Sequence, residues 1–147
     1  MTSEPAPGTP SAKLAAAADR VLSDRWLAYP SEAASSGLHD FDGQLSVVTT
    51  ASIASRVDGL RAALADIRTI PADGLSPREW ADRELLISGI DNELFELVDL
   101  RSYESNPMAL MYPIAVTNYM DRSYAPVEQR LASLAEVLRQ VPGYLES

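Results

Sequence analysis

The spacing of the apolar residues limits the fold of this chain more than any other feature. Over residues 52–69 they recur at alternating steps of four and three, the period of one face of an α-helix. The residues of this stripe are Ile53, Val57, Leu60, Leu64 and Ile67. The same rhythm returns over residues 126–141 at Val127, Leu131, Leu134, Leu138 and Val141. Both stretches are predicted to be amphipathic helices, and Pro142-Gly143 is predicted to end the second.

Two further helices follow from their start and stop signals. Ser11 is a candidate N-cap for a first helix that runs to about Tyr29 and ends before Pro30. Ser76-Pro77-Arg78-Glu79 places Ser, Pro and Glu at the positions of a capping box, so a third helix begins here and continues to about residue 101. The third helix is apolar around more than half of its circumference, and we expect it to be central, with neighbours on two sides.

The segments between these helices differ in composition. Residues 1–10 hold three prolines and are predicted to be a disordered lead-in. Residues 31–50 are predicted to be a loop with one short helical turn, in which Val47-Val48-Thr49-Thr50 has strand-like composition but no second strand to pair with. Residues 102–125 are rich in Tyr and Met, and their two prolines prevent one continuous helix.

These elements predict an all-α fold. Four main helices would bury their stripes in a bundle, with the Tyr/Met-rich segment as an irregular connector. The predicted domain covers residues 11–147, a length sufficient for one hydrophobic core.

The overall charge and the absence of cysteine exclude several classes of function. The chain carries 21 acidic against 12 basic residues, a formal net charge of −9, and no basic run, so nucleic acid is not an expected partner. Without cysteine there is no disulfide, thiolate nucleophile or cysteine-bound metal. The N-terminus lacks the features of a secretory signal, and no apolar stretch is long enough to cross a membrane. The predicted location is therefore the cytoplasm.

The single histidine, His39, lies beside Asp40 and Asp42 in a Gly-rich stretch. Imidazole and carboxylate groups suit a metal or acid–base site. A zinc site needs three or four protein ligands, and nothing in the sequence identifies the others. The alternative is a turn in which the Asp side chains accept hydrogen bonds from nearby backbone N–H groups, and this interpretation is favoured.

The third helix carries two further sets of charged residues. Its acidic residues Asp91, Glu93, Glu96 and Asp99 scatter around the polar side, so a solvated acidic face is favoured over a pair of catalytic carboxylates. Arg83 and Arg101 fall on the apolar stripe, where either one would reach water or pair with a neighbouring acid rather than bind a substrate carboxylate.

The Tyr/Met-rich segment admits two interpretations. Such side chains are common in interfaces and ligand pockets, and they also fill irregular cores; the sequence does not separate these alternatives. No HExxH, Gly-x-Ser-x-Gly, phosphate-loop or dinucleotide-binding motif occurs. We therefore assign no catalytic, cofactor-binding or metal-binding residue.

Several local patterns occur together in a recognisable order. They are Tyr29-Pro30-Ser31-Glu32-Ala33-Ala34, Gly37-Leu38-His39-Asp40-Phe41-Asp42-Gly43-Gln44-Leu45, Leu75-Ser76-Pro77-Arg78-Glu79, Asn106-Pro107, Arg130-Leu131 and Val141-Pro142-Gly143-Tyr144-Leu145. This ordered set, over most of residues 14–147, resembles the N-terminal region of the bacterial family called domain of unknown function 885.

The resemblance implies a part of a larger helical protein. Members of that family are longer, and their C-terminal half carries an HExxH helix like that of zinc metallopeptidases, in which two His residues bind zinc and the Glu acts as general base. None of these residues occurs here, so no site residue is carried over, and zinc is implied only for longer members. The expected role is a non-catalytic wall of a substrate cleft, partnered by the C-terminal half. The alternatives are a self-sufficient interaction module, such as a homodimer, and an enzyme that uses His39.

Overall fold

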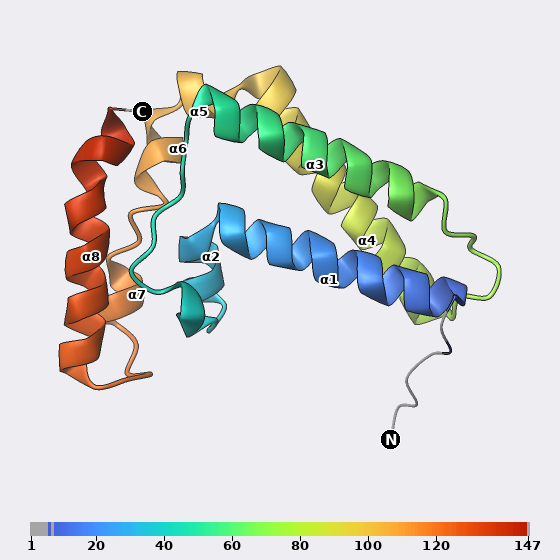
Figure 1. Cartoon of the computed structure of the whole chain (residues 1–147), viewed down its shortest axis with the longest axis horizontal. Helices are drawn as coiled ribbons and strands as arrows, with labels where there is room; N and C mark the ends of the chain where they lie inside the picture. Colours follow the sequence, from blue (N-terminus) through green and yellow to red (C-terminus); the bar gives the residue numbers. More distant parts are fainter. Residues whose placement is uncertain (1–5, 7, 147) are drawn as a thin grey trace. The chain divides into compact units, whose positions relative to one another are not determined.

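The structure is a computed structural model of the chain, in which Ala6 and residues 8–146 are described. The predicted all-α class is confirmed: the described residues form helices and no strand (Figure 1). The helices are α1 (Pro10–Ala28), α2 (Pro30–Ser35), η1 (His39–Phe41), α3 (Thr50–Arg68), α4 (Pro77–Leu94), η2 (Phe95–Leu100), α5 (Ser102–Ser105), α6 (Pro107–Met111), α7 (Thr117–Met120) and α8 (Val127–Leu145). None of these helices is both long enough and apolar enough to span a membrane.

The described residues fall into two compact units, each with its own apolar cluster. The first unit contains the residues up to Ser23 together with Ala54–Arg101, and the second contains Asp24–Ile53 and the residues from Ser102 onwards. The buried residues of the first cluster are Leu14, Ala17, Leu60, Leu64, Ile67, Ile70 and Ile90. Those of the second are Leu45, Tyr119, Leu134, Val137 and Tyr144. Each unit therefore has a separate hydrophobic core.

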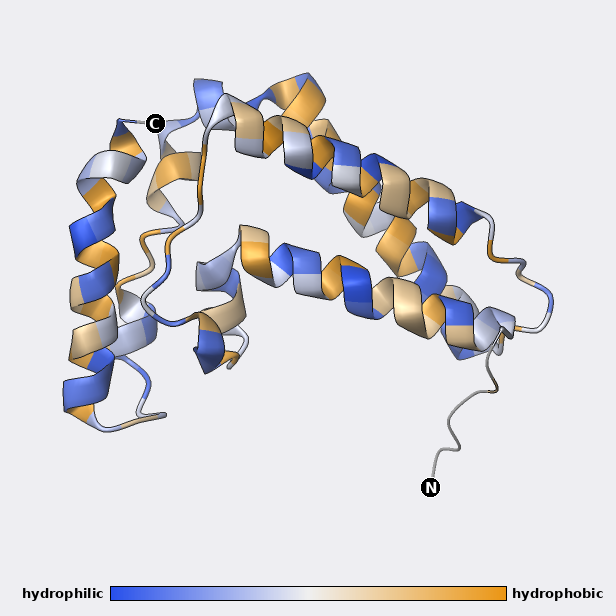
Figure 2. Cartoon of the chain, viewed as in Figure 1, coloured by the Kyte–Doolittle hydropathy of each residue, from blue (hydrophilic) through white to orange (hydrophobic). Residues whose placement is uncertain are grey.

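In the first unit, α3 confirms the predicted apolar stripe. Its buried residues are Val57, Leu60, Leu64 and Ile67, and they alternate with polar positions along the helix (Figure 2).

The first helix also forms, but its cap was assigned wrongly. The hydroxyl of Thr9, rather than that of Ser11, accepts a hydrogen bond from the backbone N–H of Ala12 at 3.2 Å, because Pro10 occupies the first helical position. Residues 1–5 and 7 of the predicted lead-in lie outside the described residues.

The start of α4 has the predicted capping box. The Ser76 hydroxyl accepts from the Glu79 N–H at 3.3 Å, and the Glu79 carboxylate accepts from the Ser76 N–H at 2.7 Å. Hydrogen bonding of the Glu79 carboxylate with Ser76 holds the pKa of Glu79 below its ordinary value. The predicted helix continues beyond α4 as the π-helical turn η2 and ends at Arg101, whose φ of 49° lies in the left-handed region.

In the second unit, the predicted end of the last helix was wrong. Pro142 lies inside α8, which continues to Leu145. A proline in a helix lacks one backbone donor, but burial of the Tyr144 ring in the second core stabilises the turn that follows.

The predicted single turn in residues 31–50 is instead the helix α2 together with η1. The Tyr/Met-rich connector is irregular, as predicted, and forms the short helices α5, α6 and α7.

Candidate functional site

The histidine-containing loop, residues 37–45, joins α2 to the segment before α3. It begins at Gly37 and turns at Gly43, both at positive φ, which glycine adopts at little cost. At Gly43 the backbone also approaches α8 closely, since an added Cβ would lie 3.5 Å from the Glu136 Cβ. Between the two glycines, His39–Phe41 form the single 3₁₀ turn η1. A turn therefore forms here, as predicted, but its side-chain hydrogen bonds differ from the predicted ones.

The structure brings His39 and Asp42 together and adds Tyr124, which sequence reasoning did not identify. The His39 ring stacks on the Tyr124 ring with 3.5 Å between centroids and 6° between planes. Nδ1 of His39 lies 3.3 Å from Oδ1 of Asp42, and the Tyr124 hydroxyl donates to Oδ2 of Asp42 at 2.6 Å. The Asp42 carboxylate therefore bonds two side chains, whereas the turn interpretation predicted backbone N–H donors. Asp40 is exposed and takes no part in this cluster.

The rest of the loop is held by the last two helices of the unit. The backbone N–H of Gly43 donates to the Tyr119 hydroxyl at 3.1 Å. The Gln140 amide donates to the Gly43 carbonyl at 2.7 Å and accepts from the Leu45 N–H at 3.3 Å. Arg130 donates to the Tyr119 carbonyl at 2.6 Å and thereby ties α7 to α8. These bonds give the loop a defined conformation.

The electrostatics of the cluster favour neutral phenols. Burial, together with the hydrogen bond to the Asp42 carboxylate and its negative charge, raises the pKa of Tyr124 well above its ordinary value of 10.0. Burial also raises the pKa of Tyr119. Each of these phenols has a higher pKa in the folded chain than in the unfolded chain. Its contribution to the free energy of unfolding is therefore fully present below about pH 10, and it is lost as the pH rises through the folded-state pKa. The cluster thus joins the loop to α7–α8 through neutral tyrosines and one charged carboxylate.

The described residues around His39 do not fit a zinc site. No group of three or more His, Asp or Glu side chains within the described residues is arranged to hold a metal ion. His39 and Asp42 supply two donors at most, and Asp42 is already hydrogen-bonded to Tyr124. A zinc site takes at least three protein ligands. The cluster is suited to holding the loop in place.

Asp42 is expected to contribute measurably to stability. The Asp42→Asn variant keeps an acceptor but loses the charge that strengthens two contacts, so the free energy of unfolding should fall by about 1–2 kcal/mol. The pKa of Tyr124 should fall in the same variant, which absorbance of the tyrosinate ion measures. Asp40→Asn, in the same loop but exposed, is the matched control and should leave both quantities unchanged. Equal effects of the two variants in urea denaturation would contradict this account.

The acidic residues of α4 are not a uniformly solvated face, and that prediction was wrong for Glu93. Glu93 is buried and forms a two-pronged ion pair with Arg56 of α3, with Nε to Oε1 at 2.8 Å and Nη2 to Oε2 at 3.0 Å. Asp91 pairs with Arg68 at the surface. Arg83 pairs with the neighbouring Glu84 at 2.5 Å, as the structural interpretation predicted. The Glu93 and Asp91 carboxylates thus pair with two different arginines of α3 and do not converge on one point.

Some side chains of the Tyr/Met-rich segment fill the core and others lie at the surface, so each of the two interpretations holds for part of the segment. Tyr119 is buried in the second core, while Tyr112 and three methionines are about half exposed or more. These methionines are Met108, Met111 and Met120. One tyrosine therefore fills the core, and the other named side chains lie at the surface.

Comparison with known proteins identifies one family. Residues 30–147 match the model of a family described as "Bacterial protein of unknown function (DUF885)". No curated protein and no solved structure matches the chain. The matched range includes the histidine-containing loop, α3, α4 and α8. Because the match covers most of the sequence, the chain belongs to the DUF885 family.

Proposed function

We propose that this chain is the non-catalytic N-terminal helical region of a zinc-dependent hydrolase of the metallopeptidase type. Membership of the DUF885 family carries the proposal, since the resemblance stated above implies an HExxH helix in longer members. The chain itself offers one histidine and no cysteine, so the zinc ligands would come from the C-terminal half of such a protein. Its own role would be to form part of the wall of the substrate cleft.

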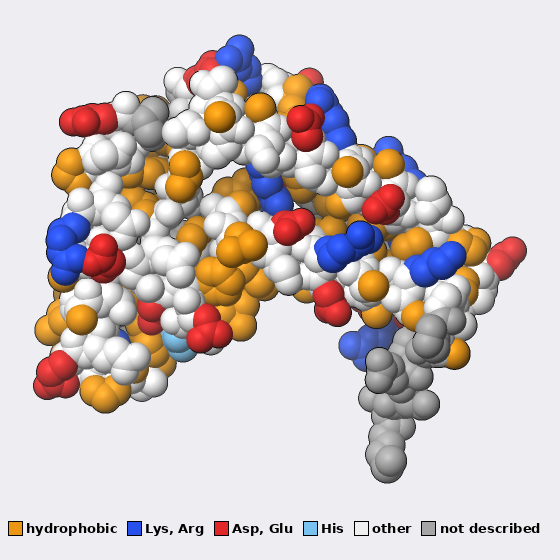
Figure 3. Space-filling view, viewed as in Figure 1, with side chains coloured by type: hydrophobic (Ala, Val, Ile, Leu, Met, Phe, Trp, Pro, Cys, Tyr) orange, Lys and Arg blue, Asp and Glu red, His pale blue; other side chains and the backbone are white. Residues whose placement is uncertain are grey.

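Exposed apolar side chains on the first unit support a partner surface. On α4 and η2, Trp80, Leu85 and Phe95 are about half exposed or more, and Val98 and Leu100 are more than 40% exposed. Figure 3 shows hydrophobic side chains at the surface among charged ones. Exposed apolar side chains that form a contiguous patch are typical of surfaces that bind another protein segment. We propose that the C-terminal half of the protein covers this surface.

A second candidate function rests on α8. Leu131, Leu138 and Leu145 are seven residues apart and each is about half exposed. A seven-residue repeat of leucines places them on one stripe, which is suited to packing against another helix. This observation favours a helical interaction module, such as a homodimer, if the protein has no hydrolase activity.

Zinc content and native size test the proposal. The native protein is purified with an antibody raised against residues 1–147. Its zinc content and its hydrolysis of a fluorogenic peptide mixture are then measured and compared with those of the isolated chain. The native protein should be larger than 147 residues, hold about one zinc ion and cleave peptides, because the metal motif lies outside this sequence. The isolated chain should hold far less than one zinc ion and cleave nothing.

Two outcomes would contradict the proposal. A native protein of 147 residues that forms a defined dimer without peptidase activity would support the interaction module instead. Stoichiometric zinc with hydrolysis in the isolated chain would place the site within these residues, and loss of activity in His39→Ala would then assign it to the histidine-containing loop.

A further inference from the structure

The sequence contains three Asp-Gly pairs, and the folded chain holds them in three different environments. They are Asp42-Gly43, Asp58-Gly59 and Asp73-Gly74. An aspartate that precedes glycine can react with the next residue, because glycine has no side chain to shield its backbone nitrogen. The product is a five-membered ring, and water can open this ring so that the chain continues through the aspartate side chain. How readily each pair reacts depends on how freely its backbone can move.

The first pair is fixed by two tyrosines of the second unit. The Asp42 side chain is only 10% exposed, and its carboxylate accepts a hydrogen bond from the Tyr124 hydroxyl. The backbone N–H of Gly43, whose nitrogen would have to attack, donates to the Tyr119 hydroxyl at 3.1 Å. Both reacting groups of this pair are therefore engaged in hydrogen bonds.

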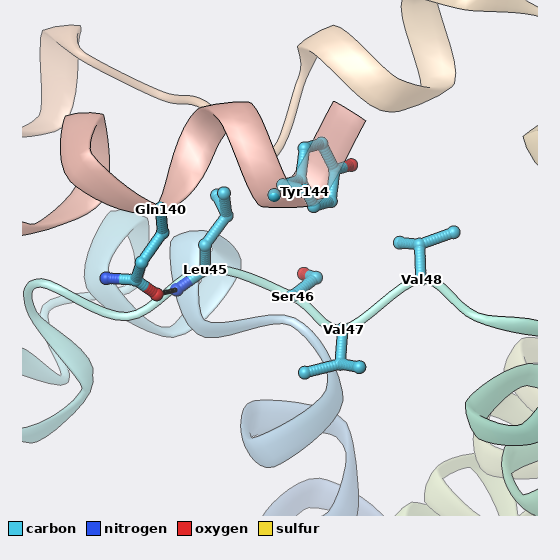
Figure 4. A pocket seen from close by; sticks show the side chains of 7 residues that line it. Leu45, Ser46, Val47, Val48, Gln140 and Tyr144 are labelled. Atoms are coloured by element: carbon cyan, nitrogen blue, oxygen red, sulfur yellow. Dashed lines mark hydrogen bonds between the residues drawn. The ribbon is translucent and has the colours of Figure 1, made fainter. Parts of the chain in front are cut away.

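The chain that follows Gly43 is also fixed. The backbone N–H of Leu45 donates to the Gln140 side chain at 3.3 Å (Figure 4). Residues 45–48 run along α8, beside a pocket of about 210 Å³ at Ser46. The backbone on this side of the first pair thus has little freedom to rotate.

The second pair is exposed to water but lies inside a helix. Asp58 and Gly59 are both exposed, and the Asp58 side chain is 81% exposed. They belong to the interior of α3, where each backbone N–H donates to the carbonyl four residues earlier. The Gly59 nitrogen can reach the Asp58 carboxyl group only after the helix opens locally. Opening the interior of a packed helix costs much more free energy than opening a surface loop.

The third pair lies in the loop between α3 and α4. Asp73 and Gly74 are both exposed and form the centre of a turn, which the Leu75 N–H closes by donating to the Ala72 carbonyl at 3.1 Å. Gly74 has a φ of 93°, the left-handed value that a type II turn requires at its third residue. Ring closure requires the peptide plane between Asp73 and Gly74 to rotate, and a single turn at the surface opens at little cost.

We propose that Asp73-Gly74 is a site of spontaneous isoaspartate formation, and that the fold protects the other two pairs. The Gly74 nitrogen loses its proton and bonds to Cγ of Asp73, while Cγ loses its hydroxyl group; the proton and the hydroxyl leave as water. A second water molecule then attacks the main-chain carbonyl carbon of Asp73, and the bond from this carbon to the Gly74 nitrogen breaks. Gly74 stays joined to Cγ, and the former main-chain carbonyl becomes a free carboxylate.

This reaction needs no metal, oxidant or second part of the protein, so it does not depend on the proposed hydrolase role. The isoaspartyl link adds one carbon to the main chain of the loop and changes the position of its negative charge. Ser76, which caps α4, follows Asp73 by three residues. The modified link therefore lies directly before the start of α4.

The test follows isoaspartate at each pair in the full chain. The chain is incubated for weeks at physiological temperature and neutral pH, both folded and in guanidinium chloride. A repair methyltransferase that esterifies the isoaspartyl carboxylate with the methyl group of S-adenosylmethionine measures the total, and mass spectrometry of proteolytic peptides locates it. In the folded chain the Asp73 peptide should carry roughly tenfold more isoaspartate than the Asp42 or Asp58 peptide. In denaturant the three peptides should react at similar rates.

Two variants of Asp73 change the chemistry and leave the loop exposed. Asp73→Glu keeps the negative charge but cannot form the five-membered ring, so methylation of the folded chain should fall to the level set by the other two pairs. Asp73→Asn should react faster than the wild-type chain, because the side-chain amide releases ammonia more readily than the carboxyl group releases water. Circular dichroism checks that both variants remain helical.

Three outcomes would overturn the proposal. The first is equal isoaspartate at the three pairs of the folded chain, which would mean that the fold protects none of them. The second is the absence of isoaspartate at Asp73 in the folded chain. The third is unchanged methylation of folded Asp73→Glu, which would place the reaction at another residue.

Discussion

Replacing Glu93 with leucine is expected to lower the free energy of unfolding of the first unit by about 3–5 kcal/mol. The carboxylate and the Arg56 guanidinium are only 10% and 14% exposed, and two hydrogen bonds of 2.8 and 3.0 Å join them. Removing one partner leaves the other charge in a site that water solvates poorly. The double variant Arg56→Met with Glu93→Leu should recover about 2 kcal/mol of the loss, since neither charge then remains.

The exposed pair of the same two helices is the control. Arg68 and Asp91 lie 3.1 Å apart with about half of each side chain exposed, so Asp91→Ala should cost less than about 1 kcal/mol. Unfolding in urea is followed by fluorescence of Trp80 in a Trp26→Phe background, because Trp80 lies in the first unit and Trp26 in the second. Similar losses for Glu93→Leu and Asp91→Ala would show that burial of the pair does not matter.

Replacing Ile67 with alanine is expected to destabilise the first unit by about 2–5 kcal/mol. Ile67 is 0% exposed and lies in the first cluster with Leu60, Leu64 and Ile90. Truncation leaves a cavity that a packed core fills only partly. Since small domains are stable by about 5–15 kcal/mol in total, this one change removes a large share of the stability.

The graded variants Ile67→Val and Leu85→Ala test whether the loss follows burial. Ile67→Val removes one methylene and should cost about 0.5–1.5 kcal/mol. Leu85 is 70% exposed on α4, so Leu85→Ala should change stability by less than about 0.5 kcal/mol. The same Trp80 fluorescence measures all three, and a cost for Ile67→Ala no larger than that for Leu85→Ala would refute the assignment of this core.

Helices whose signals are local were predictable from the sequence. The capping box at Ser76 and Glu79 acts within one turn, and the stripe of α3 depends only on the helical period. The all-α class followed from these signals. The end of α8 was mispredicted, because the local effect of Pro142 is outweighed by burial of Tyr144 against residues distant in the sequence.

The candidate sites could not be predicted in the same way. Asp42 and Tyr124 are 82 residues apart, and Arg56 and Glu93 are 37 apart. Helical periodicity predicts on which side of α4 Glu93 lies. It does not predict which residue of another helix contacts that side. An acidic residue on the polar side of a helix is therefore predicted to be solvated, although in the folded chain it can be buried against a basic residue of another helix.

The sequence by itself therefore determined the helical class, the main helices, one capping box and the family resemblance, because each depends on neighbours within a few turns or on residue order. Only the tertiary structure decided the two separate cores, the buried Arg56–Glu93 pair, the His39–Asp42–Tyr124 cluster and the pocket at Ser46. These features depend on which surfaces the folded chain brings into contact, and a side chain's burial and partners exist only after that packing is formed.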